Sequence, residues 1–151
     1  MMNPNITILP MDVSTAHEAA ALEKLCFSSP WSADSLIEAI GRADSSFLAA
    51  FVGGEFAGYA GMLCVLDEGQ ICNVAVCPAF RRMGVGEALM AAQKDAATSR
   101  GVSVMMLEVR ASNTAAQRLY EKMGWEMIGT RKNFYSHPRE DAILYNLYLN
   151  T

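Results

Sequence analysis

A glycine-rich segment between a strand-like run and a helix-like run constrains this chain most. Residues 71–77 are apolar and strand-like, residues 87–99 have helical spacing, and Arg81-Arg82-Met83-Gly84-Val85-Gly86 connects them. A helix that begins here has backbone N–H groups without internal partners, and the positive end of its dipole lies at the loop. Gly84 and Gly86 carry no Cβ atom, so a ligand can approach the backbone closely. The segment therefore predicts a site for an anion, most simply a phosphate or pyrophosphate.

The composition favours a single globular domain over residues 1–151. Of the 151 residues, 52% are hydrophobic and 19% are charged, which is typical of a chain with a substantial core. The net charge of −4 argues against binding to nucleic acid or to an anionic membrane. No apolar run reaches the roughly 18 residues that span a bilayer, and residues 1–10 lack the pattern of a signal peptide. A cytoplasmic location is expected.

The cysteines and histidines do not predict a metal site. The cysteines are Cys26, Cys64, Cys72 and Cys77. They form no C-x-x-C pair, and three lie in strand-like apolar runs, so we interpret them as small buried hydrophobic residues. Neither histidine lies near a cysteine in the sequence, and we expect no bound metal.

Hydrophobic periodicity and turn residues predict an α+β order of elements. Gly53-Gly54 is a strong hairpin signal, Ser32 is a helix cap, and Gly41, Gly101 and Gly124 end helices. The expected strands are residues 6–9, 47–52, 55–66, 70–77, 103–109, 125–132 and 142–149, and the expected helices are 12–25, 33–40, 87–99 and 113–123. This order predicts a mixed, mostly antiparallel central sheet with helices on both faces.

Three kinds of phosphate-binding loop compete for the glycine segment. A Walker loop requires a lysine directly after its last glycine, and Gly86 is followed by Glu87. A dinucleotide fingerprint requires a third glycine, where this chain has Leu89, and a preceding parallel unit instead of the antiparallel meander expected here. The remaining pattern is R-x-x-G-x-G, formed by Arg81, Gly84 and Gly86.

This pattern, in this order of elements, resembles the GNAT superfamily of N-acetyltransferases over nearly the whole chain, about residues 6–149. The resemblance implies the GNAT fold and acetyl-coenzyme A as the cosubstrate. It implies that the loop holds the pyrophosphate and that the preceding strand pairs with the pantetheine amides. The positions carried over are Val74, Ala75, Val76, Arg82, Met83, Gly84, Val85, Gly86 and Glu87.

A narrower resemblance rests on five segments in the right order. The segments are residues 27–32 (FSSPWS), 73–76 (NVAV), 107–113 (LEVRASN), 119–121 (LYE) and 139–142 (REDA). Together they are similar to the bacterial enzymes that acetylate the N-terminal alanine of a ribosomal small-subunit protein. The resemblance implies that such a protein N-terminus is the acceptor. A relative with a different acceptor could keep most of these segments.

Amide formation from a thioester requires a base for the incoming amine and an acid for the departing thiolate. Glu108 follows apolar neighbours in a predicted strand, where it is either a cleft carboxylate or an edge charge paired with Arg110. Tyr120 lies two helical turns after Asn113, where it is either a functional phenol or a packing residue. The resemblance implies that Glu108 accepts the amine proton and that Tyr120 protonates the thiolate.

Other residues have both a structural and a functional interpretation. Asn113 precedes a helix and predicts an N-cap, and the resemblance adds a cofactor contact. Trp31 is either part of a hydrophobic plug or a wall of the acceptor site, a role that the resemblance suggests. Glu140 and Asp141 form either a solvated turn or a pair of acids that bind a basic residue of the acceptor.

Two other functions stay open at the level of the sequence. The same fold can acetylate a small amine such as a polyamine, an amino acid or an antibiotic. A coenzyme A-binding module without catalysis is the second alternative, and it would not need the chemistry of Glu108 and Tyr120.

Overall fold

The computed structural model describes residues 5–149, which form seven strands in one sheet, four α-helices and a short 3-10 turn. The strands are β1 (Ile6–Pro10), β2 (Ser45–Val52), β3 (Glu55–Val65), β4 (Glu68–Val76), β5 (Val104–Arg110), β6 (Glu126–Tyr135) and β7 (Glu140–Tyr148). The helices are α1 (Val13–Cys26), α2 (Ala33–Ile40), α3 (Val85–Ser99) and α4 (Thr114–Lys122). The expected order of elements is confirmed, with most boundaries shifted by one to three residues.

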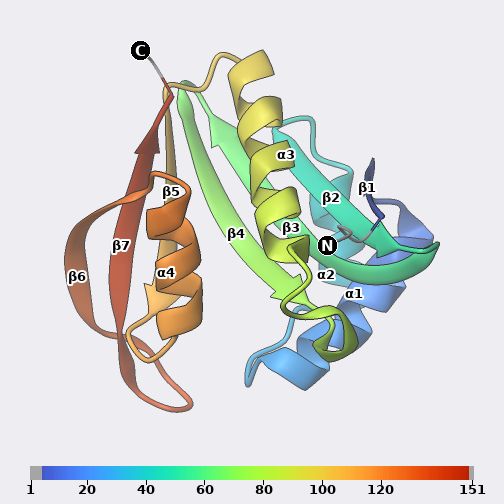
Figure 1. Cartoon of the computed structure of the whole chain (residues 1–151), viewed down its shortest axis with the longest axis horizontal. Helices are drawn as coiled ribbons and strands as arrows, with labels where there is room; N and C mark the ends of the chain where they lie inside the picture. Colours follow the sequence, from blue (N-terminus) through green and yellow to red (C-terminus); the bar gives the residue numbers. More distant parts are fainter. Residues whose placement is uncertain (1–4, 150–151) are drawn as a thin grey trace.

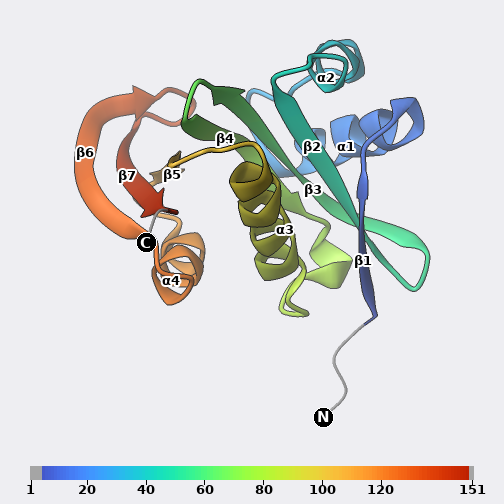
Figure 2. The ribbon, with the colours of Figure 1, turned by 90° about the horizontal axis from the view of Figure 1, so that it is seen from above.

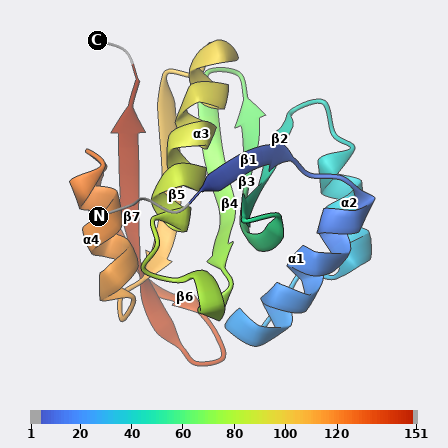
Figure 3. The same ribbon diagram turned by 45° about the vertical axis from the view of Figure 1, so that its right-hand side comes forward.

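The sheet is mixed and mostly antiparallel, as expected. Its strand order is β1-β2-β3-β4-β5-β7-β6, and only the β4–β5 pair is parallel. The crossover from β4 to β5 runs through α3, as a parallel connection requires. In Figure 2, α1 and α2 lie on one side of the sheet and α3 and α4 on the other. Figure 3 shows α4 beside β7, at the opposite end of the sheet from α1 and α2.

Alternation along β5 divides its side chains between the two faces of the sheet. Met105, Leu107 and Val109 are buried in the core that also contains Tyr120 of α4. Because successive strand residues point to opposite faces, Glu108 and Arg110 lie on the face that α1 and α2 cover farther along the sheet. A second core lies between α1, α2 and strands β2 to β4.

The parallel pairing of β4 with β5 ends early. The paired residues are Glu68 with Val104, Gly69 with Met105 and Gln70 with Met106. Beyond Gln70 the two strands diverge, which is visible in Figure 1. A register shift between Gly61 and Met62 of β3 leaves Cys72 of β4 as an extra, unpaired residue, which is a β-bulge. Divergence and bulge together leave part of β4 without a neighbour on the β5 side.

The helices of the described residues include none that is long and apolar enough to cross a bilayer.

Candidate active site

A cleft of about 570 Å³ lies where β4 and β5 separate. Four segments line it: the end of α1 with the following loop, the middle of β4, the second half of β5 with α4 and its N-cap, and the end of β6 with the following turn. Its lining includes Glu23, Phe27, Trp31, Asn73, Val74, Glu108, Arg110, Asn113, Tyr120, Phe134, Tyr135 and Ser136. Five of these residues are candidates from the sequence: Trp31, Val74, Glu108, Asn113 and Tyr120. The cleft thus brings together candidates from segments far apart in the chain.

The glycine loop presents a row of free backbone donors. The N–H groups of residues 82–87 donate no hydrogen bond to any described residue, and the first helical bond runs from Ala88 N–H to the Gly84 carbonyl. Gly84 is the N-cap of α3 with φ at +86°, a conformation that a residue with a Cβ adopts only with strain. Free donors at a helix N-terminus form an anion-binding site.

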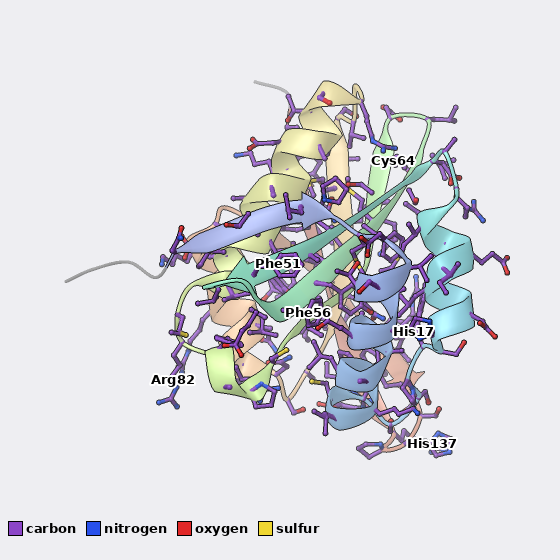
Figure 4. The ribbon with its side chains drawn as sticks, turned by 90° about the vertical axis from the view of Figure 1, so that its right-hand side faces the viewer. His17, Phe51, Phe56, Cys64, Arg82 and His137 are labelled. Atoms are coloured by element: carbon purple, nitrogen blue, oxygen red, sulfur yellow. The ribbon has the colours of Figure 1, made fainter. Side chains whose placement is uncertain are left out.

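The two arginines of the loop differ in what they do. Arg81 donates from Nε to the Val76 carbonyl (3.3 Å) and from a terminal nitrogen to the Cys26 sulfur (3.5 Å), so it ties the loop to β4 and α1. Arg82 has a left-handed backbone with φ at +64°. Its side chain is exposed and points away from the body of the protein in Figure 4. Only Arg82 is therefore free to add charge at the rim of the loop.

Alternate residues of β4 direct their backbone N–H and C=O groups toward the gap on the β5 side. Cys77 N–H donates to the Ala57 carbonyl, which makes residues 57 and 77 a hydrogen-bonded antiparallel pair. By alternation, Ala75 also directs its backbone groups to β3, whereas Val74 and Val76 direct theirs to the gap. Of the three strand residues expected to pair with a pantetheine, Val74 and Val76 have the required orientation. Ala75 is instead buried against α1 and α2.

Gly86 lies beside Leu119 of α4 and Val76 of β4. A Cβ built at Gly86 would lie 3.5 Å from Leu119 of α4 and 3.8 Å from Val76 at the end of β4. A side chain here would project into the space between α3, α4 and β4, directly beyond the free donors. These are ordinary van der Waals separations, so a methyl group fits here but takes up space that the glycine leaves free.

Glu108 and Tyr120 reach the cleft from opposite faces of the sheet. Glu108 is half-buried, and its Oε1 accepts a hydrogen bond of 3.4 Å from Gln70 Nε2. Tyr120 is 7% exposed and belongs to the core beneath α3 and α4. Both line the cleft because the separation of β4 from β5 opens a passage through the sheet. The alternative in which Glu108 pairs with Arg110 is not seen, because Arg110 pairs with Glu140.

The environment of Tyr120 keeps its phenol protonated. Burial raises the pKa of Tyr120 to about 12. Its ring packs against Trp125 and Tyr145, with centroid separations of 6.0 and 6.2 Å. The hydroxyl makes no hydrogen bond to any residue from 5 to 149, and Tyr120 lines the cleft. The hydroxyl is therefore available to a ligand.

Asn113 and Trp31 hold their predicted positions at the cleft. Asn113 is the N-cap of α4, and its Oδ1 accepts a hydrogen bond from Ala116 N–H (3.2 Å). The amide nitrogen of its side chain stays available to the cleft that it lines. Trp31 is half-buried, with its ring 6.3 Å from that of Phe47. It forms part of the wall that follows α1.

Glu140 and Asp141 form hydrogen bonds within the protein. Glu140 accepts hydrogen bonds from Arg110 (3.2 Å) and from the backbone N–H of Ser112. Asp141 accepts from the backbone N–H of Asn133 (2.9 Å). The Ser112 bond is the main reason that the pKa of Glu140 lies below its usual range. Neither acid lines the cleft, so this geometry does not support the expected pairing with a basic residue of an acceptor.

Two groups of cleft residues are not among the candidates predicted from the sequence. Phe134, Tyr135 and Ser136 reach the cleft from the β6–β7 hairpin, and Arg110 lies 4.3 Å from the centre of the Tyr135 ring. The pattern in the sequence that could have indicated them is the aromatic pair Phe134-Tyr135 next to a turn. Glu23 lies on the buried stripe of α1, one turn after Ala19, and a carboxylate on an apolar stripe was a signal available in the sequence.

The cysteines are less buried than expected. All four are free and half-buried, and Cys26 and Cys72 line the cleft. Burial raises the pKa of the Cys72 thiol, so it stays protonated and is a poor nucleophile at neutral pH. Among residues 5–149 no cluster of three or more metal-ligating side chains occurs.

Comparison with known families decides the family. Residues 16–125 match the model of the acetyltransferase (GNAT) family. The chain belongs to the GNAT family of acetyltransferases. The predicted fold and enzyme class are thereby confirmed. Two solved structures that share the fold, from Salmonella typhimurium and Arabidopsis thaliana at 21% and 18% identity, contain acetyl-coenzyme A. The free donors at the start of α3 suit such a molecule.

The similarity extends over nearly the whole chain. The [ribosomal protein bS18]-alanine N-acetyltransferase of Escherichia coli K12 is 36% identical over 143 residues, which are 93% of this chain and 96% of that protein. The crystal structure of the E. coli ribosomal-protein-S18-alanine N-acetyltransferase superposes with a TM-score of 0.87, covers 97% of this chain and 95% of that one, and is 33% identical. Ard1 from Thermoplasma volcanium shares the fold, with a TM-score of 0.88 at 24% identity over 97% and 99% of the two chains.

Proposed function

We propose that this enzyme transfers an acetyl group from acetyl-coenzyme A to the N-terminal α-amine of a ribosomal small-subunit protein, with alanine as the first residue. The proposal rests on relatives that carry this activity in their names and match over nearly their whole length. The cleft that would receive the acceptor is lined with polar and aromatic side chains. An enzyme with this acceptor would work where ribosomes are made, in the cytoplasm.

The proposed path of the cosubstrate follows the free backbone groups. The N–H groups from Arg82 to Glu87 hold the pyrophosphate. Val74 and Val76 offer backbone groups to the pantetheine amides along the open edge of β4. The side-chain amide of Asn113 contacts the cosubstrate near the start of α4. The acetyl end then lies in the passage between β4 and β5.

One observation carries the proposed chemistry: a carboxylate and a phenol reach the same cleft from opposite faces of the sheet. Glu108 lies on the side of α1 and α2, and Tyr120 lies on the side of α3 and α4. A cosubstrate that enters along α3 and an acceptor that enters beside α1 would meet between them. This arrangement separates the base from the acid, as the reaction requires.

The proposed reaction is a direct transfer. Glu108 accepts a proton from the acceptor amine, directly or through one water. The amine nitrogen forms a bond to the acetyl carbon, and the bond between carbon and sulfur breaks. Tyr120 gives its proton to the departing sulfur, and solvent restores it. No acetyl-enzyme is formed, in agreement with a Cys72 thiol that burial keeps protonated.

The test uses the purified chain, acetyl-coenzyme A and a peptide with the N-terminal sequence of bS18. The expected product is the peptide with one acetyl group on its α-amine, located by fragment masses. The control is the same peptide with a blocked N-terminus, which should gain nothing. Double-reciprocal plots of the initial rate at several concentrations of the second substrate should intersect, as is typical of a ternary complex. Parallel lines would indicate an acetyl-enzyme.

The alternative functions are outcomes of the same test. Acetylation of polyamines, amino acids or aminoglycosides without acetylation of the peptide would assign a small-amine acceptor. If Glu108→Gln and Tyr120→Phe bind acetyl-coenzyme A and still complement a deletion strain, the chain acts as a coenzyme A-binding module without catalysis.

A further inference from the structure

A buried carboxylate beside the cleft has no part in the chemistry described above. Glu23, near the end of α1, is 1% exposed and lines the cleft. Its Oε2 accepts hydrogen bonds from the Tyr59 hydroxyl (2.6 Å) and from Asn73 Nδ2 (3.1 Å). Its Oε1 accepts a hydrogen bond from the backbone N–H of Trp31 (3.0 Å). One side chain thus joins α1 to β3, to the bulged part of β4 and to the loop after α1.

Glu23 holds the loop of residues 27–31 at both ends. Its backbone carbonyl accepts a hydrogen bond from Phe27 N–H (2.9 Å), where the helix ends. Its carboxylate binds the N–H of Trp31, where the loop ends. Between these two points lie Ser28 and Ser29, and both line the cleft with Phe27 and Trp31. A single residue therefore fixes both ends of the loop that forms one wall of the cleft.

The hydrogen bonds of Glu23 favour a structural role over a role as the base. Both carboxylate oxygens already accept hydrogen bonds, and the side chain is almost fully shielded from solvent. No arginine or lysine among residues 5–149 forms an ion pair with it. Burying a carboxylate without a cation is costly, and apolar packing is often the more stable solution. A charge kept here is better explained by the three segments that it positions than by stability alone.

We infer that Glu23 is a positioning residue for the acceptor side of the active site, acting through the loop of residues 27–31. The inference rests on the proposed function, because that loop is one wall of the cleft that would receive the acceptor peptide. The cosubstrate side is formed by α3, α4 and the edge of β4, which Glu23 contacts only through Asn73. Loss of the carboxylate should therefore affect acceptor binding more than binding of acetyl-coenzyme A.

The first experiment compares Glu23→Gln with the parent enzyme. We expect the KM for the acceptor peptide to rise about tenfold, while kcat and the Kd for acetyl-coenzyme A change less than about twofold, since one lost contact of this kind is worth about a factor of ten. Tyr59→Phe deletes the 2.6 Å hydrogen bond to Glu23 and the 3.1 Å hydrogen bond that the Tyr59 hydroxyl accepts from Asn73 Nδ2, and it keeps the packing of the ring. It should raise the same KM by a smaller factor, and it keeps the question testable if the first variant folds poorly.

Gln93→Leu is the matched control. Gln93 is also fully buried, and its side chain bonds to Ser46 and to the carbonyl of Ala60, but it does not line the cleft. It should lower the melting temperature without changing the KM for the acceptor. If Gln93→Leu and Glu23→Gln change that KM equally at equal loss of stability, Glu23 has no specific positioning role.

A second measurement does not depend on the identity of the acceptor. The two tryptophans are Trp31 and Trp125, so a Trp125→Phe background leaves Trp31 as the single fluorophore. In this background, Glu23→Gln should raise the acrylamide quenching constant of Trp31, and Gln93→Leu should not. If the parent enzyme does not acetylate the peptide but Glu23→Gln raises the quenching constant of Trp31, the proposed acceptor is wrong and the positioning role stands. If the parent acetylates the peptide and Glu23→Gln alters neither KM nor quenching, the inference is overturned.

Discussion

At the scale of single residues, the two groups that we propose as base and acid have different surroundings. Glu108 lies on the α1–α2 side with Gln70 as its hydrogen-bond donor. Tyr120 lies in the opposite core with its hydroxyl free to meet a ligand. The bulge at Cys72 and the divergence of the strands create the space between them. Each group can therefore be tested with little disturbance to the other.

Removal of the carboxylate charge at Glu108 should slow the reaction most at neutral pH. We expect Glu108→Gln to lower kcat/KM for the peptide by about 10²–10⁴ at pH 7, because an α-amine with a pKa near 7.7–8.0 must first lose a proton. The deficit should shrink above pH 8, where the free amine dominates. Rates across this pH range check it, with Glu126→Gln on the exposed part of β6 as the control. A deficit that is constant with pH would show that Glu108 is not the base.

Removal of the phenol proton at Tyr120 should lower kcat without unfolding the protein. Burial raises the pKa of Tyr120 to about 12, so the acid stays protonated and no loss of rate is expected on the alkaline side below about pH 10. Tyr120→Phe should reduce kcat roughly 10- to 100-fold, because the thiolate then leaves without a proton donor. Tyr145→Phe is the control: it breaks the 2.8 Å bond to Glu121 and should affect stability instead of kcat. Equal effects of both variants on kcat would contradict the role of Tyr120.

At the scale of elements, the start of α3 combines an uncommon backbone with unused donors. Gly84 adopts φ at +86°, and the N–H groups of residues 82–87 donate to no described residue before the first helical bond forms. A Cβ at Gly84 would meet no atom within 4 Å. The energetic cost of a Cβ at Gly84 is thus limited to strain in the backbone, about 1–2 kcal/mol.

Gly84→Ala should therefore weaken binding of acetyl-coenzyme A through the loop geometry. We expect the Kd to rise about tenfold, measured by calorimetry, because relief of about 1–2 kcal/mol of strain shifts the donors away from the pyrophosphate. Gly54→Ala is a close match, since Gly54 also has φ at +86° and open space around it, but it lies in the β2–β3 hairpin. It should lower stability similarly and leave the Kd unchanged. An unchanged Kd in Gly84→Ala would remove the loop from the binding site.

At the scale of the whole molecule, the buried Glu23 links stability to pH. Burial raises the pKa of Glu23 above its ordinary value of 4.5, in spite of its hydrogen bonds to Tyr59 and Trp31. The folded protein therefore binds this proton more tightly than the unfolded chain does. The contribution to the free energy of unfolding is greatest at or below pH 4.5, falls as the pH rises through the raised pKa, and is constant above it.

Glu23→Gln should remove this dependence. The difference in unfolding free energy, parent minus Glu23→Gln, should decrease as the pH rises from about 4.5 and then become constant, because only the parent has the titrating group. Urea unfolding at a series of pH values measures it. Gln93→Leu should differ from the parent by an amount that does not vary with pH. A parent-minus-variant difference that grows with pH would mean that the pKa of Glu23 is lowered by folding.

The sequence by itself determined the local structure of this protein and predicted the loop that we propose for the cosubstrate. Helix caps such as Ser32 and Asn113, the hairpin at Gly53-Gly54 and the turn at Gly84 depend on a few adjacent residues, so their patterns are legible along the chain. The tertiary structure alone decided which side chains meet. The placement of β7 between β5 and β6 gives Glu140 and Asp141 structural partners, and the early end of the β4–β5 pairing opens the cleft. These outcomes depend on long-range packing, which adjacent residues do not encode.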